Sequence, residues 1–170
     1  IGGGFAGVEA AWQLANRGFE VELFEMKPVK FSPAHKSELL GELVCSNSLK
    51  AKRFESAAGL LKTEMRFFGS LCMECADLSE VPAGGALAVD RDKFSELITE
   101  KIKNHKNITL INQEITEIPE GNVIVAAGPL ASDALSEKIS ELCGDGLHFF
   151  DAAAPIVSRE SIDMESAFTA

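Results

Sequence analysis

The sequence is poor in positive charge and cysteine and has no long apolar run, and each shortage excludes a class of protein. Lys and Arg number 16 against 26 Asp and Glu, which gives a formal charge of −10 in 170 residues. Surfaces that bind nucleic acid are usually basic, so this segment alone is not expected to be one. No apolar run approaches the roughly 20 residues of a membrane span, and no charged-then-apolar signal segment is visible.

The cysteines are too few and too irregularly spaced for a secreted disulfide scaffold. They are Cys45, Cys72, Cys75 and Cys143. With no targeting segment, we expect a cytoplasmic protein with neither a membrane nor DNA as partner. Cys72 and Cys75 form a C-x-x-C pair, but zinc would need a second ligand pair at similar spacing, and the sequence has none. We therefore predict packing for this pair and no metal site.

A glycine-rich turn opens the chain, and it comprises Gly2, Gly3, Gly4, Phe5, Ala6 and Gly7. Its G-x-G-x-x-G spacing is followed by a helical apolar stripe and a short strand pattern that ends on Glu25. In a dinucleotide site, Gly2 permits the tight turn, Gly4 lets backbone approach a pyrophosphate, and Gly7 lets helix and strand pack closely. The helix start would direct unpaired N–H groups at the phosphates, and Glu25 would accept from a ribose hydroxyl. An ordinary strand-to-helix turn is the alternative, but strand, helix and terminal acid all lie in register.

A second informative stretch follows a long irregular loop over residues 26–43. Such loops are usually functional or disordered, and a lone loop histidine such as His35 is most often solvated. Ser46, Asn47 and Ser48 are all good N-cap residues, which predicts a helix start there. Cys45 would then lie beside a helix N-terminus, where the dipole favours a reactive thiolate. The competing interpretation is a small buried hydrophobe, and the spacing leaves both open.

The rest of the chain alternates helices and strands, which predicts an α/β, doubly wound, Rossmann-like fold. Helical patterns cover residues 57–68, 70–78, 91–104 and 132–142, and strand patterns cover 86–89, 108–111, 115–118, 123–126 and 156–157, with an apolar run at 149–154. The glycine turn of residues 127–129 follows the apolar strand at its carboxyl end, where open α/β sheets hold ligands. Ile1 resembles the last residue of a first strand, so we expect a domain that is incomplete at both ends.

Several longer blocks resemble one family. They are the glycine turn and residues 25–30 (EMKPVK), 33–35 (PAH), 42–49 (ELVCSNSL), 81–91 (VPAGGALAVDR), 127–130 (AGPL), 151–157 (DAAAPIV) and 161–164 (SIDM). In this order they resemble the bacterial folate- and FAD-dependent tRNA (uracil-5-)-methyltransferases, the TrmFO family. The chain would be the N-terminal part of its glutathione-reductase-like FAD-binding domain. Residues 26–85 would form an active-site loop and helical segment within that domain.

The resemblance implies methylation of the T-loop uridine of tRNA with 5,10-methylenetetrahydrofolate as carbon donor. FAD would relay the one-carbon unit and supply electrons, and NAD(P)H would reduce the flavin again. By position, the glycine turn holds the FAD pyrophosphate and Glu25 its ribose. Met26 is a further cofactor-binding candidate, and the turn with Gly128 and Pro129 lies against the cofactor.

Cys45 matches the family's cysteine near the flavin ring and is the catalytic candidate. A thiolate that adds at C6 of uracil makes C5 an enolate carbon able to attack an activated methylene. The family has another cysteine beyond Ala170, and either thiol could be the attacking group. Lys36 stands where many members carry a second histidine, which weakens a histidine-pair role. Because the segment is acidic, we expect tRNA to be bound mainly by residues outside it.

Three other interpretations compete. The GidA (MnmG) flavoprotein, which modifies the wobble uridine, has a similar glycine motif, but its Cys-Asn-Pro and following glycine pair are not found here. A small-molecule flavin or NAD oxidoreductase fits the glycine motif, but the blocks at 42–49 and 81–91 argue against it. The third is a non-catalytic remnant.

Overall fold

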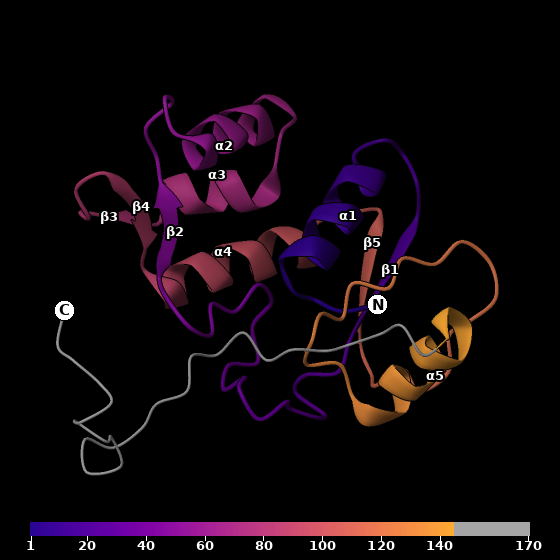
Figure 1. Cartoon of the computed structure of the whole chain (residues 1–170). Helices are drawn as coiled ribbons and strands as arrows, with labels where there is room; N and C mark the ends of the chain where they lie inside the picture. The colour runs from indigo at the N-terminus through magenta and orange to yellow at the C-terminus, as the bar shows by residue number, and fades with distance from the viewer. Residues whose placement is uncertain (145–170) are drawn as a thin grey trace, which may run out of the picture.

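The computed structural model describes residues 1–144 (Figure 1). The run 149–154, the strand-like segment 156–157 and the family blocks at 151–157 and 161–164 lie outside the described residues. The helices are α1 (Phe5–Ala15), α2 (Ala57–Phe67), α3 (Leu71–Leu78), α4 (Arg91–Lys103) and α5 (Asp133–Cys143). The strands are β1 (Val21–Glu25), β2 (Ser48–Ala51), β3 (Glu80–Val81), β4 (Ala86–Val89) and β5 (Ile108–Asn112).

A parallel sheet carries the start of the chain. β1 pairs in parallel with β5, with Val21 opposite Ile108. On the other side of β1, the Gly2 N–H donates to the Phe24 carbonyl at 2.8 Å. The Ile1 nitrogen donates to the Ile124 carbonyl, and the Ile1 carbonyl accepts from the Ala126 N–H, both at 2.8 Å. The order across the sheet is therefore residues 124–126, Ile1, β1 and β5.

This order places a topological switch point beside Ile1. The next strand in the chain, β1, lies on one side of Ile1, and residues 124–126 lie on the other. Open α/β sheets bind their ligands at such a point, outside the carboxyl ends of the strands. The predicted α/β, Rossmann-like fold is confirmed.

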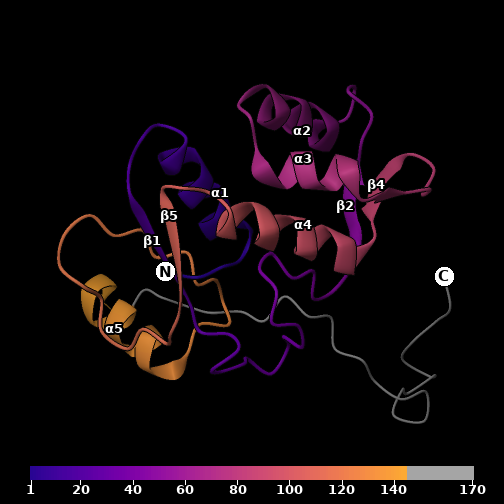
Figure 2. The ribbon, with the colours of Figure 1, turned by 180° about the vertical axis from the view of Figure 1, so that it is seen from behind.

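A second, antiparallel sheet has the strand order β2-β4-β3. It lies with α2 and α3 on one side of α4, and α1, β1 and β5 lie towards the other end of α4 (Figures 1 and 2). Asp90 lies between β4 and α4 and caps α4, since its Oδ1 accepts from the Asp92 and Lys93 N–H groups at 3.1 Å. The hydrophobic core runs through both halves and includes Val8, Ala11, Leu23, Leu71, Cys72, Cys75, Leu87, Phe94, Ile98 and Ile102.

The helix predicted to start at residues 46–48 is wrong, because these residues lead into β2. The Ser46 hydroxyl accepts from the Ser48 N–H at 3.0 Å, a local turn bond rather than a helix cap. Asn47 joins the second sheet instead. Its carbonyl accepts from the Val89 N–H at 2.9 Å, and its side chain donates to the Val89 carbonyl at 3.2 Å.

Two predicted strands also differ from the structure. Residues 115–118 form no strand, and Glu114, just before them, forms an ion pair with Lys30. Residues 123–126 follow the expected parallel path, but their pairing is limited to Ile1. They are not assigned as a strand, and Ile124 remains 52% exposed rather than buried.

Candidate functional site

Two glycines of the opening turn lie against backbone, a third lies against the Leu40 and Glu25 side chains, and one faces open space. Gly2 has a φ of +102°, and a Cβ built on it would lie 2.7 Å from the Ala126 carbonyl oxygen. A Cβ on Gly7 would collide with the carbonyl of Gly2, whereas a Cβ on Gly4 would meet nothing within 4 Å. Gly2 and Gly7 are thus required by close packing, and Gly4 faces open space.

That open space lies at the start of α1. Gly4 is the N-cap residue, and no side chain caps the helix. The first N–H groups of a helix have no intrahelical partner, and with the dipole they attract anions. A pyrophosphate fits this cradle, because backbone can approach it at Gly4 and N–H groups are available to bind it.

Glu25 lies at the end of β1 and is 7% exposed. Its Oε2 accepts from the Gly3 N–H at 2.7 Å, and its Oε1 accepts from the Lys27 N–H at 2.9 Å. The carboxylate therefore fixes the glycine turn to the carboxyl end of β1. Each carboxylate oxygen has a second lone pair, so Glu25 is also able to accept from a hydroxyl.

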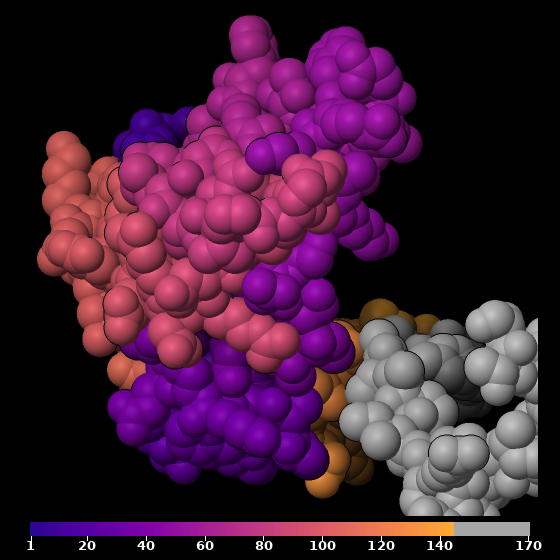
Figure 3. All heavy atoms as spheres, turned by 90° about the vertical axis from the view of Figure 1, so that its left-hand side faces the viewer, coloured from indigo at the N-terminus to yellow at the C-terminus, as the bar shows by residue number. Residues whose placement is uncertain are grey.

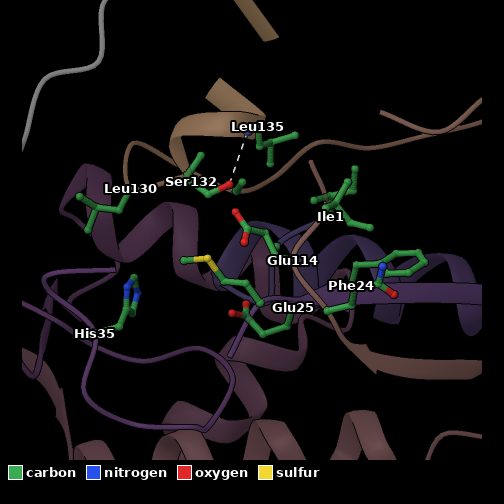
Figure 4. Close-up of a pocket in the computed structure, with 14 residues that line it drawn as sticks. Ile1, Phe24, Glu25, His35, Glu114, Leu130, Ser132 and Leu135 are labelled. Atoms are coloured by element: carbon green, nitrogen blue, oxygen red, sulfur yellow. Dashed lines mark hydrogen bonds between the residues drawn. The ribbon is translucent and has the colours of Figure 1, made fainter. Parts of the chain in front are cut away.

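A cleft extends from Glu25 to the start of α5 (Figure 4). Its lining residues are Ile1, Gly2, Phe24, Glu25, Met26, His35, Gln113, Glu114, Ile115, Ala127, Leu130, Ala131, Ser132 and Leu135. The lining combines apolar side chains with a few polar ones, a mixture typical of small-molecule sites. Gly128 and Pro129 follow Ala127 directly, and Gly2 touches this segment at Ala126 and Ala127.

Two titratable groups of the cleft were not predicted to have a specific role. His35 is half-buried, and its Nδ1 lies 2.6 Å from the Ser32 hydroxyl. Burial and then the nearby Lys27 ammonium lower the pKa of His35. The pKa of Glu114 is also lowered, because it accepts hydrogen bonds from Lys30 and Ser132. The Lys30 ammonium lies 2.7 Å from it.

The irregular loop of residues 26–43 is held by a buried ion pair. The Lys27 side chain is 5% exposed, and its Nζ donates to the Leu39 carbonyl at 2.6 Å and to Glu42 Oε2 at 3.3 Å. Burial opposes ionisation of Glu42, but backbone hydrogen bonds from Lys36 and Ser37 and the Lys27 ammonium outweigh it. The pKa of Glu42 is therefore below its usual value.

The end of this loop touches the glycine turn. The Gly41 N–H donates to the Gly3 carbonyl at 2.9 Å, and the Leu40 N–H donates to Thr99 Oγ1 at 2.9 Å. The loop is thus part of the site. Its signals in the sequence were its length without a periodic pattern and the family blocks that it contains.

Cys45 is an exposed free thiol in a bend between this loop and β2. The buried-hydrophobe interpretation is wrong, and so is the expected neighbouring helix start. No helix dipole of the predicted kind acts on this thiol. Cys45 is accessible to solvent. It lies four residues after Gly41, which contacts the glycine turn.

Cys72 and Cys75 lie in the hydrophobic core, as the packing interpretation predicts. Burial raises the pKa of both thiols, that of Cys75 to about 11. The Cys72 N–H donates to Glu9 Oε1 at 2.7 Å, so Glu9 on α1 holds the start of α3. Both cysteines are therefore structural.

Over residues 1–144, no helix is both long and apolar enough to cross a membrane. In the same part of the chain, no group of three or more His, Cys, Asp or Glu side chains is placed to hold a metal ion.

The open glycine turn at the switch point, with an acid closing β1, makes this a Rossmann-like domain of the dinucleotide-binding class. The chain belongs to the family described as glucose inhibited division protein A (GidA), which it matches over residues 1–170.

Relatives named TrmFO, a name that differs from that of the family model, are similar over the whole chain. It is 62% identical to methylenetetrahydrofolate–tRNA-(uracil-5-)-methyltransferase TrmFO of Acetivibrio thermocellus, covering 100% of this chain and 39% of the relative. The protein of the same name from Aquifex aeolicus is 61% identical over 99% of this chain and 38% of the relative. The chain therefore spans about two fifths of the length of these relatives, and the predicted resemblance is confirmed.

A solved structure of Aquifex aeolicus GidA is similar in fold. It aligns with a TM-score of 0.56 at 19% identity, covering 72% of this chain and 20% of that chain. At this identity the likeness supports the fold alone.

Proposed function

We propose that this chain is the flavin-binding part of a folate-dependent tRNA (uracil-5-)-methyltransferase. The substrate would be the T-loop uridine of tRNA, the carbon donor 5,10-methylenetetrahydrofolate and the reductant NAD(P)H, in the cytoplasm. The observation that carries the proposal is the 62% identity over the whole chain to a protein named for this reaction.

The geometry of the opening turn supports a flavin dinucleotide. Gly2 to Gly7 would bind the pyrophosphate of FAD at the start of α1, and Glu25 would bind its ribose with Met26 beside it. The turn with Gly128 and Pro129, which follows the segment against Gly2, would lie along the cofactor. When bound, FAD supplies the electrons and carries the one-carbon unit.

Cys45 is proposed as a catalytic residue because an exposed thiol is accessible to a macromolecular substrate. Its sulfur would add to C6 of uracil, so that C5 becomes nucleophilic. It would leave C6 once the C5 proton has been lost and the transferred carbon has been reduced to a methyl group with two electrons that come from NAD(P)H. The half-buried loop of residues 26–43 orients this segment through Gly41 and the Lys27–Glu42 pair.

Deletion of the gene tests the product of the reaction. tRNA from the deletion strain should lack ribothymidine in its T-loop, and the full-length gene should restore it, as read by mass spectrometry of tRNA digests. Loss of a wobble-uridine modification with normal ribothymidine would instead support a GidA-like reaction. Unchanged tRNA in both positions would support a small-molecule oxidoreductase.

A further inference from the structure

One corner of this acidic chain is basic. Between residues 46 and 66 the cations are Lys50, Lys52, Arg53, Lys62 and Arg66, and the acids are Glu55 and Glu64. Five cations less two acids leave a charge of +3 in this segment, against −10 for the chain. These residues lie on β2, on α2 and on the turn between them. We call three exposed residues of this turn region, Lys50, Arg53 and Phe54, the basic corner; Lys52 and Glu55 are exposed beside them.

The positive charge of this region is only partly neutralised. Lys52 pairs with Glu80 at 2.5 Å, and Arg66 pairs with Asp77. Within residues 1–144, neither Lys50 nor Arg53 has a carboxylate partner. Both side chains are exposed and available to a ligand.

A buried cation lies beneath the same surface. Lys62 is 6% exposed, and its Nζ donates to the carbonyls of Ala51 and Ala58, both at 3.0 Å. Burial and then the neighbouring cations Arg66 and Lys50 lower the pKa of Lys62. Carbonyl groups do not cancel an ammonium charge, so Lys62 adds to the positive potential of the corner.

The start of α2 points into this corner as well. The Ser56 hydroxyl accepts from the Gly59 N–H at 3.1 Å and donates to the Arg53 carbonyl at 2.7 Å. The positive end of the helix dipole therefore lies next to Arg53. Between Arg53 and Ser56 in sequence lie Phe54, which is 60% exposed, and the exposed acid Glu55.

The basic corner is close in sequence to Cys45, the proposed catalytic thiol. β2 begins three residues after Cys45. In Figure 3, the purple part that holds β2 and the start of α2 stands out at the upper right. The surface recedes below it, before the loop of residues 26–43 begins.

We propose that the basic corner binds the sugar-phosphate backbone of the tRNA substrate, with Phe54 as a stacking surface for an unpaired base. Separate cations around an exposed aromatic ring fit RNA, because phosphates are spaced along the chain and unpaired bases stack on aromatic side chains. The inference rests on the proposed function. It adds a tRNA contact within this part of the chain to the basic surface expected outside it.

The test compares neutral variants of the full-length, flavin-loaded enzyme. Lys50→Asn with Arg53→Gln removes two charges, and asparagine suits the left-handed backbone of Lys50, whose φ is +68°. Lys103→Asn with Lys106→Gln removes two exposed charges near the far end of α4 and is the matched control. The probe is unmodified tRNA transcript, and the dissociation constant is measured at several salt concentrations.

We expect the corner variant to bind tRNA about tenfold or more weakly. The slope of its affinity against salt concentration should fall by the amount that about two phosphate contacts contribute. Phe54→Ala should weaken binding without changing the salt dependence, because stacking releases no counterions. The control variant should bind like the wild type. Wild-type binding and salt dependence in the corner variant, with an active wild-type methyltransferase, would overturn this inference alone. A wild-type enzyme that neither binds nor methylates tRNA would overturn the proposed function.

Discussion

At the scale of single residues, the glycine turn separates a packing requirement from a ligand requirement. Gly7 has no room for a side chain because the Gly2 carbonyl lies against it, whereas Gly4 faces open space. The G-x-G-x-x-G spacing predicted both duties from the sequence, since they follow from backbone geometry common to this turn. The two substitutions to alanine should therefore fail in different ways.

Gly4→Ala should leave a folded protein that has lost its flavin, because the added methyl meets no protein atom but enters the predicted path of the pyrophosphate. Gly7→Ala should prevent stable folding. The measurements are flavin absorbance after gel filtration and circular dichroism of the same samples. A yellow Gly4→Ala enzyme would show that the pyrophosphate does not lie at this turn.

Glu25→Gln should destabilise the protein by about 1 to 3 kcal/mol, because one of two backbone N–H donors then faces an amide NH₂ group. The lost bond is one of those from Gly3 and Lys27. Urea unfolding measures the change, and the exposed Glu20→Gln is the control. Equal stability of the two variants would mean that Glu25 does not hold the turn.

Cys45→Ala should retain FAD and reduce methyl transfer at least about tenfold, because the thiolate proposed to activate uracil would be lost. Cys143→Ala, which removes another exposed thiol, should have normal activity. Methyl transfer is measured under single-turnover conditions. Near-normal transfer by Cys45→Ala would assign the attack on uracil to another cysteine.

At the scale of elements, local signals succeeded where they agreed with tertiary pairing. α4 was predictable because Asp90 caps a helix whose apolar residues recur at helical spacing. The segment after Cys45 has equally good capping residues, but Asn47 pairs with β4, and this long-range pairing overrode the local preference. The Lys27–Glu42 pair was likewise not predictable, since nothing local indicates which loop cation becomes buried.

Glu42→Gln should cost about 3 kcal/mol of stability at neutral pH, because it leaves the buried Lys27 ammonium without its carboxylate. The pKa of Glu42 is depressed in the folded state, so its contribution is full above its ordinary value of 4.5 and is lost as the pH falls below it. Glu38→Gln, exposed in the same loop, is the control.

Urea unfolding measured above and below pH 4.5 tests this pair. The wild type and Glu38→Gln should lose stability in parallel as the pH falls, and the gap between wild type and Glu42→Gln should narrow. A gap that stays constant with pH would show that Glu42 does not act through its charge.

At the scale of the whole molecule, α4 joins a Rossmann-like sheet to a small antiparallel sheet (Figure 1). The first sheet has the open glycine turn, and the second follows the exposed Cys45 and carries the basic corner. The proposed cofactor site and the proposed tRNA-binding surface are thus built on one core. This division fits an enzyme that brings a bound flavin to a nucleotide of tRNA.

The proposed reaction is tested most directly by tracing the transferred carbon. Full-length enzyme, unmodified tRNA and NADPH are incubated with methylenetetrahydrofolate labelled in its one-carbon unit, and the tRNA is digested to nucleosides. If the proposed function is correct, label appears in the methyl group of T-loop ribothymidine. Unlabelled tRNA from an enzyme that binds FAD and consumes NADPH would contradict it.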